Sequence, residues 1–141
     1  RKIGFIFQAY NLIPTLTALE NAEYVMLLQG IDKNKRLNKA KEILGKLGLK
    51  DCLYKRPGEL SGGQQQRVAV ARAIVSEPEV ILADEPTANL DSANASSLID
   101  SMYELNREKE ITFIFSTHDK MVMEKAHKVF LLRDGKLIND P

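Results

Sequence analysis

Residues 60–67, which read Leu-Ser-Gly-Gly-Gln-Gln-Gln-Arg, constrain the fold of this 141-residue chain more than any other stretch. Ser61 and Gln64 are spaced as a capping box, so we expect a helix that begins here and runs to about residue 76. Pro78 marks its end. Residues 80–83, Val-Ile-Leu-Ala, then form a continuous apolar run of the kind expected for a strand buried on both faces of a parallel sheet.

The rest of the sequence alternates strand and helix signals. Apolar runs at residues 3–7 and 111–115 indicate two further strands. Capping signals or helical spacing indicate helices at residues 18–29 and 37–47, after a cap at Asp91 or Ser92, and from about residue 120. Asp134-Gly135 is a two-residue hairpin signal. This order predicts an α/β fold with a mainly parallel sheet.

Composition narrows the classes of function. The formal net charge is +1, which gives no global electrostatic reason to expect nucleic acid binding. The single cysteine, Cys52, cannot form an internal disulfide. No apolar run approaches the ~20 residues of a membrane span. If the protein acts at a membrane, partner subunits or other segments must supply the membrane part.

The expected helix start at residues 61–63, Ser-Gly-Gly, has the chemistry of a phosphate site. A helix N-terminus presents unpaired N–H groups and a partial positive charge. Glycines let an anion approach the backbone, and the Ser61 hydroxyl adds a donor. Such a sequence is by itself more often only a helix cap, so the surrounding motif carries the functional interpretation.

Two adjacent carboxylates, Asp84 and Glu85, follow the apolar run at residues 80–83. Ligands bind beyond the carboxyl ends of the strands in open α/β folds, so Asp84 is placed to hold Mg²⁺. Glu85 is placed to act as general base on a water. His118 and Gln8 follow the other two expected strands, and each alone would more often be a surface residue.

Together these segments resemble the motifs of ATP-binding-cassette (ABC) ATPases. Residues 60–67 resemble the signature, 80–86 the Walker B motif, 86–91 the D-loop, His118 the switch histidine and Gln8 the Q-loop glutamine. The resemblance covers essentially the whole chain. It implies a P-loop NTPase-like three-layer α/β sandwich, with a helical signature subdomain at about residues 18–76 and a catalytic core from residues 1–8 and 77–141.

The resemblance also assigns roles. It implies ATP and Mg²⁺ as cofactors, bound between two subunits, one of which supplies the Walker motifs and the other the signature. It makes Glu85, His118 and Gln8 catalytic, Asp84 and Gln8 metal-binding, and Ser61, Gly62, Gly63, Gln64 and Asp91 nucleotide-binding. The expected partners are a second ATPase subunit and transmembrane permease subunits, with no nucleic acid, at the cytoplasmic face of the cell membrane.

Residues 3–14 and 16–21 look most like the lipoprotein-release and macrolide-export ATPases, which couple hydrolysis to mechanical work on a membrane partner. One expected motif is absent, since no G-x-x-x-x-G-K-[ST] loop occurs in the 141 residues. We therefore expect a fragment, cut just before a core strand, that lacks the N-terminal part of the domain. By itself this fragment should bind ATP poorly and be inactive.

Besides the transport ATPase, the sequence leaves open a second interpretation, a soluble ABC-type ATPase, and a third, non-catalytic one. A soluble ABC-type ATPase acting on DNA would carry long coiled coils before the signature, and no heptad run lies between Gln8 and Leu60. One that acts on ribosomes has two cassettes in one chain, which a single cassette does not exclude. The third interpretation is a non-catalytic interaction fragment.

Overall fold

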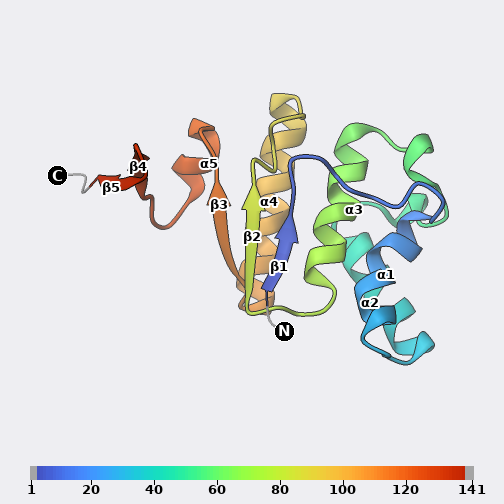
Figure 1. Cartoon of the computed structure of the whole chain (residues 1–141). Coiled ribbons are helices and arrows are strands. Elements are labelled where there is room, and N and C mark those ends of the chain that lie inside the picture. The colour runs from blue at the N-terminus through green and yellow to red at the C-terminus, as the bar shows by residue number, and fades with distance from the viewer. Residues whose placement is uncertain (1–2, 139–141) are drawn as a thin grey trace.

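The computed structural model describes residues 3–138 as an α/β structure with a three-stranded and a two-stranded sheet (Figure 1). The predicted α/β class is confirmed, and the boundaries lie within a few residues of those expected. The elements are β1 (Ile3–Ile6), α1 (Ala18–Leu28), α2 (Lys33–Lys46), the 3₁₀ turns η1 (Lys50–Cys52) and η2 (Pro57–Glu59), α3 (Gly62–Ile74), β2 (Val80–Asp84), α4 (Ser92–Lys109), β3 (Thr112–Ser116), α5 (Lys120–Lys125), β4 (Leu131–Arg133) and β5 (Lys136–Ile138).

The main sheet is parallel, in the order β1-β2-β3. Ile6 pairs with Ala83, and Asp84 pairs with Ser116. Because parallel strands all end at the same edge, the residues that follow β1, β2 and β3 are brought together there. The sheet thus gathers the three predicted strand-end segments at one edge.

Helices cover one face of this sheet within the described residues. Ile6, Ile81 and Ala83 point into the core, where they join the apolar residues of α3 and α4. Gly4 lets β1 approach α3 closely, because a Cβ there would lie 2.8 Å from the carbonyl oxygen of Ala73. Figure 1 shows α4 behind the three strands.

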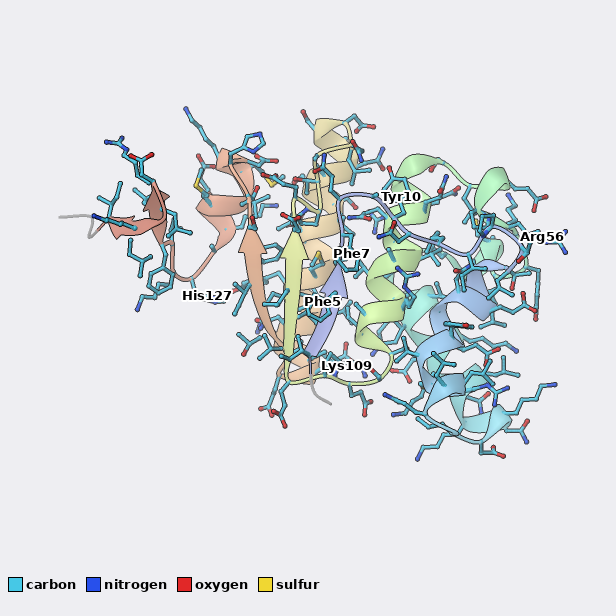
Figure 2. All side chains as sticks on the ribbon, viewed as in Figure 1. Phe5, Phe7, Tyr10, Arg56, Lys109 and His127 are labelled. Atoms are coloured by element: carbon cyan, nitrogen blue, oxygen red, sulfur yellow. The ribbon has the colours of Figure 1, made fainter. Side chains whose placement is uncertain are left out.

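The opposite face of the sheet is open in the described residues. Phe5 is 49% exposed and Ile114 is 53% exposed, and Leu82 between them is half-buried. Figure 2 shows Phe5 and Phe7 on β1 and just beyond it. The expectation that residues 80–83 are buried on both faces is therefore wrong here, because the helices that adjoin the sheet all pack on the same side.

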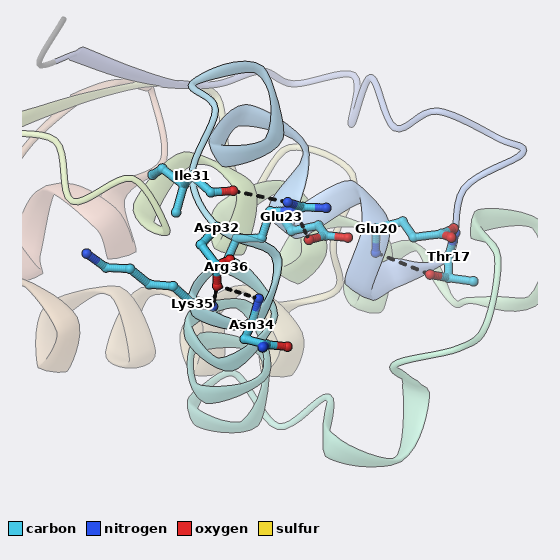
Figure 3. Close-up of polar contacts among 8 residues, drawn as sticks. All are labelled: Thr17, Glu20, Glu23, Ile31, Asp32, Asn34, Lys35 and Arg36. Carbon is cyan, nitrogen blue, oxygen red and sulfur yellow. Dashed lines mark hydrogen bonds and ion pairs between the residues drawn. The ribbon is translucent and has the colours of Figure 1, made fainter.

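Helices α1, α2 and α3 pack against one another and form the helical part of the chain. The capping box predicted for α1 is present, with the Glu20 N–H donating to Thr17 Oγ1 at 3.2 Å. Arg36 of α2 pairs with the buried Glu23 of α1 at 2.7 Å and also donates to the Ile31 carbonyl (Figure 3). The division of the chain at residues 18–76 stays a prediction.

The C-terminal strands β4 and β5 form the predicted hairpin. Asp134 and Gly135 both have positive φ, 49° and 73°, as a type I′ turn requires. Among residues 3–138, no helix combines the length and apolar character needed to cross a bilayer.

Candidate functional site

A cleft of about 400 Å³ opens where β1 and β2 end. It is lined by the last residue of β2, Asp84, and by residues that follow the two strands: Phe7, Gln8, Ala9, Asn11 and Asn89. Gln8 and Asp84, the two residues predicted to bind metal, therefore share one cleft. This is the position at which open α/β sheets bind ligands.

The donors in this cleft are hard oxygen atoms, from the Asp84 carboxylate and the Gln8 side-chain amide. Mg²⁺ is commonly bound by one or two carboxylates, with water and substrate phosphates completing the octahedron. No cluster of three or more His, Cys, Asp or Glu side chains that could hold a metal occurs in the part of the chain that the structure describes. The donor set thus fits Mg²⁺ that arrives with a phosphate ligand rather than a protein-only metal site.

Glu85 and His118, the predicted base and switch histidine, are brought together in the structure. Nδ1 of His118 lies 2.7 Å from Oε1 of Glu85. The Thr117 hydroxyl donates to the other carboxylate oxygen at 3.4 Å. The Glu85 side chain is 22% exposed and that of His118 is 90% exposed, so the pair lies at the surface beyond the strand ends.

The backbone at Glu85 adopts the left-handed conformation, with φ of 44°. Such a conformation is unfavourable for a residue with a side chain, and it persists only where surrounding contacts enforce it. Here the Glu85 N–H donates to the carbonyl of Ser116 at the end of β3, at 2.8 Å. The backbone bond and the side-chain contacts to Thr117 and His118 together fix the carboxylate against the end of β3.

Residues 86–91, the predicted D-loop, connect several parts of the site. The buried side chain of Gln66 in α3 donates to the Pro86 carbonyl at 2.7 Å. The Thr87 hydroxyl donates to Asp119 at 3.1 Å, and the Asn89 amide donates to the carbonyl of Gln8 at 3.1 Å. The loop is therefore bonded to α3, to the start of α5 and to the end of β1.

Ser61 caps α3 as predicted. Its hydroxyl oxygen accepts from the Gln64 N–H at 3.2 Å, and its own N–H donates to Oε1 of Gln64 at 2.9 Å. The Gln64 side-chain amide also lies 3.6 Å from the sulfur of Cys52, so both ends of this amide contact groups of its own chain. Ser61 is exposed, and its hydroxyl proton is left available for an external acceptor.

The two glycines of the predicted signature, Gly62 and Gly63, each lie close to another side chain. A Cβ at Gly62 would lie 2.9 Å from the hydroxyl of Tyr10, and one at Gly63 would lie 3.5 Å from the side chain of Asn94. None of the four residues at positions 61–64 lines the cleft that contains Gln8 and Asp84. The predicted metal-binding residues in the cleft and the predicted nucleotide-binding residues at positions 61–64 thus lie on different parts of the surface of one chain.

Asp91 is the N-cap of α4. Its two carboxylate oxygens accept from the backbone N–H of Asn94 at 2.9 Å and from the Asn94 side chain at 2.7 Å. Hydrogen bonds from the Asn94 backbone and side chain lower the pKa of this exposed carboxyl. Since Asn94 also lies against Gly63, the N-termini of α3 and α4 adjoin.

The sequence analysis gave no individual role to several residues around this site: Asn89, Thr117, Gln66 and Arg72, which donates to the carbonyls of Tyr10 and Asn11 in the loop that follows β1. Arg72 carried a signal, because it is a charged residue between two alanines, Ala71 and Ala73, in the expected helix. Gln66 lies within the predicted signature at residues 60–67, but its bond to the Pro86 carbonyl could not be read from the motif. Asn89 lies within the predicted D-loop and Thr117 beside the predicted switch histidine, but their individual contacts were not predictable because their partners lie 81 and 32 residues away in the sequence.

The chain is similar in sequence to ATP-binding proteins of known transporters. Residues 1–88 match the ABC transporter family. The chain is 46% identical, over 138 residues, to the lipoprotein-releasing system ATP-binding protein LolD of Syntrophus aciditrophicus, covering 98% of the chain and 62% of LolD. It is 49% identical, over 137 residues, to the macrolide export ATP-binding/permease protein MacB of Hyphomonas neptunium, covering 97% of the chain and 21% of MacB.

Among solved structures, the chain resembles the ATP-binding cassette MJ0796 in a dimeric post-hydrolysis state bound to ADP and Pi. The TM-score is 0.85 at 40% identity, and the match covers 98% of this chain and 61% of that one. A second dimeric structure of MJ0796 gives a TM-score of 0.86. The chain therefore spans about three fifths of the length of LolD and of this solved cassette.

Proposed function

Since this chain belongs to the ABC transporter family, we propose that it forms part of the ATP-binding subunit of a membrane transporter. In this proposal the subunit binds and hydrolyses MgATP at an interface with a second copy of itself. It works at the cytoplasmic face of the membrane, bound to permease subunits. The likeness to LolD and MacB supports a system that performs mechanical work on its membrane partner, as in lipoprotein release or macrolide export.

The cleft beyond β1 and β2 is the proposed half-site for the metal and the phosphates. Asp84 and Gln8 would hold Mg²⁺, which when bound neutralises developing charge on the phosphate oxygens. Glu85 accepts the proton of the attacking water at its carboxylate. His118, whose Nδ1 lies 2.7 Å from Oε1 of Glu85, would orient that carboxylate, and its largely exposed side chain would be free to contact the terminal phosphate.

The start of α3 is the proposed second half-site, which serves the nucleotide of the partner subunit. Ser61 and the N–H groups of Gly62 and Gly63 present donors at a helix N-terminus, where an anion is stabilised. These donors lie outside the cleft of their own chain, which supports a site completed by two chains. Asp91, at the adjoining start of α4, belongs to the same proposed interface.

One observation carries the proposal: the parallel register places Gln8 and Asp84 in one cleft and joins Glu85 to His118 at the adjacent strand end. A non-catalytic interaction fragment would not require two oxygen donors suited to Mg²⁺, from Gln8 and Asp84, next to the Glu85 carboxylate, whose backbone adopts an unfavourable left-handed conformation. Co-purification of the full-length protein with a permease would distinguish the proposed transporter subunit from a soluble ABC ATPase.

The decisive experiment uses the full-length protein and its Glu85→Gln variant. We expect steady-state ATP hydrolysis to fall by about 10²–10⁴-fold, because an amide cannot act as the base. ATP binding should persist, and size-exclusion chromatography with ATP should show a trapped dimer. Asp84→Asn should instead raise the Mg²⁺ concentration that hydrolysis requires.

The matched control is Glu104→Gln, which changes an exposed carboxylate on α4 away from the strand ends. It should leave hydrolysis and dimerisation unchanged. If Glu85→Gln retained more than a few per cent of wild-type turnover, the assignment of the general base would be wrong.

We also propose that the 141-residue chain alone is inactive and binds ATP weakly, because its sequence contains no G-x-x-x-x-G-K-[ST] loop to cradle the phosphates. Titration calorimetry that gave micromolar affinity for ATP would contradict this.

A further inference from the structure

The loop that follows β1 is held through its backbone carbonyls. Arg72 of α3 donates from Nη1 to the carbonyl of Asn11 at 2.6 Å and from Nη2 to the carbonyl of Tyr10 at 3.0 Å. Asn89 donates to the carbonyl of Gln8 at 3.1 Å. Three carbonyls within four residues are thus bound by side chains from two distant segments.

Arg72 is built into this position. It is half-buried between the fully buried residues Ala71 and Ala73, and burial lowers the pKa of its guanidinium. In the described part of the chain its guanidinium donates hydrogen bonds to these two carbonyls and forms no ion pair with a carboxylate. A planar guanidinium can bond both carbonyls at once, which a lysine ammonium on a flexible stem cannot reproduce.

Fixing these carbonyls sets the direction of Gln8. The Gln8 side chain is exposed and lines the same cleft as Asp84, and its backbone carbonyl accepts a bond from Asn89, which lines that cleft too. Asn11 also lines the cleft and has a left-handed φ of 51°, a conformation that needs support from its surroundings. Arg72 binds the carbonyl of this residue.

The same loop reaches the start of α3. The Tyr10 hydroxyl occupies the space that a side chain at Gly62 would need, and Figure 2 shows Tyr10 beside that end of the helix. Tyr10 is therefore joined to α3 at two levels, by its hydroxyl near Gly62 and by its carbonyl at Arg72. Displacement of the Gln8 loop would have to move or break both contacts.

We propose that Arg72 is a positioning residue of the nucleotide cleft, which fastens the loop of Gln8 to α3 and so holds the Gln8 side chain toward the metal. The proposal rests on the function proposed above, because it requires Gln8 to act on bound Mg²⁺. It adds that the metal-side loop and the signature helix of one chain move as a unit.

The first test measures the loop itself, without nucleotide. Chymotrypsin cleaves after exposed tyrosines, and Tyr54, which is 72% exposed, provides an internal reference in the same chain. In the full-length protein we expect Arg72→Met to speed cleavage after Tyr10 about ten- to a hundredfold relative to Tyr54, the factor for losing hydrogen bonds from a charged donor. Arg72→Lys should be intermediate.

The matched control is Arg67→Met. Arg67 lies in the same helix, is also half-buried, and donates to the Leu47 carbonyl and to the hydroxyls of Ser97 and Ser101, away from the Gln8 loop. It should leave the Tyr10-to-Tyr54 cleavage ratio unchanged, even if it lowers overall stability. An equal rise in this ratio for both variants would overturn the proposal.

The second test asks whether Arg72 acts through Gln8. We expect Gln8→Ala and Arg72→Met each to raise the Mg²⁺ concentration at half-maximal hydrolysis, and the double variant to raise it no more than Gln8→Ala alone. Arg67→Met should combine additively with Gln8→Ala. Additive effects of Arg72→Met and Gln8→Ala would overturn the positioning role.

The two tests separate the inference from the function on which it rests. If Gln8→Ala left the Mg²⁺ requirement unchanged, the proposed role of Gln8 would fail, whatever the cleavage assay gave. If Gln8→Ala raised the requirement while Arg72→Met changed neither this requirement nor the cleavage ratio, only the role of Arg72 would fail.

Discussion

The substitution Ser61→Ala can distinguish the capping role of Ser61 from its proposed contact with a nucleotide, because Thr17 provides a matched helix cap elsewhere in the chain. Thr17 and Ser61 both form complete capping boxes, and in each the N3 backbone N–H donates to the hydroxyl oxygen at 3.2 Å. The reciprocal bonds are 2.8 Å at Thr17 and 2.9 Å at Ser61. Thr17 caps α1, and only Ser61 belongs to the proposed interface.

The structural cost of the two substitutions should be nearly the same. Replacing an N-cap serine or threonine by alanine typically costs about 1 kcal/mol of stability. We therefore expect Thr17→Ala and Ser61→Ala to lower the free energy of unfolding by similar amounts in urea denaturation. A difference between them in any other property then cannot be attributed to the cap.

The functional cost should fall on Ser61 alone. In the proposed dimer the free hydroxyl proton of Ser61 donates to a phosphate of the partner's nucleotide, and a hydrogen bond to a charged group contributes about 1.5–3 kcal/mol. At about 1.4 kcal/mol per factor of ten, its loss weakens each site about 10- to 150-fold. The Thr17→Ala variant should dimerise like the parent protein.

The assay is analytical ultracentrifugation at increasing ATP in the Glu85→Gln background, where turnover does not consume the ligand. We expect Ser61→Ala to need at least tenfold more ATP or protein for half-maximal dimerisation. If Ser61→Ala matched Thr17→Ala both in stability and in ATP-dependent dimerisation, the Ser61 hydroxyl would be a cap and nothing more.

Two further predictions concern the fold. Gly4→Ala should lower the free energy of unfolding by about 1–3 kcal/mol, because its Cβ would lie 2.8 Å from the Ala73 carbonyl. Gly45→Ala, in an open position in α2, should raise it by about 0.5–1 kcal/mol, and equal stabilities in urea would refute this reasoning. The lowered pKa of Asp91 means that its charge stabilises the fold above the ordinary value of 3.8, and that this contribution disappears as the pH falls through the lower folded value. Asp91→Asn should thus be less stable than wild type at pH 7 and approach it below pH 3.8, whereas an unchanged difference at low pH would contradict the assignment.

Local signals made most of the secondary structure predictable. The capping boxes at Thr17 and Ser61 fixed two helix starts, and the turn residues Asp134 and Gly135 fixed the hairpin. Each signal is satisfied by atoms within a few residues of itself, so it survives without knowledge of the tertiary structure. The cleft was predictable for a related reason, since parallel strands that end in polar residues must present them at one edge.

The features that were not predictable depend on distant partners. Burial of residues 80–83 on one face rather than both depends on which side of the sheet the helices occupy, and no single strand encodes that. The left-handed conformation of Glu85 depends on a bond to Ser116 in the next strand. Arg72 meets its carbonyl partners across 61 and 62 residues, so its role is visible only in the folded chain.

Taken with the proposed two-chain site, the contacts of Tyr10 have a mechanical consequence. In a symmetric pair, each chain offers a cleft at Gln8 to its own nucleotide and a helix start at Ser61 to the nucleotide of its partner. Arg72 and the Tyr10 hydroxyl join these two surfaces within one chain. A nucleotide that moves Gln8 in one cleft must therefore also move the donors at Gly62 that face the other. The two sites of such a pair would be coupled through these contacts in each chain, and Arg72→Met, which loosens the Gln8 loop, should reduce that coupling.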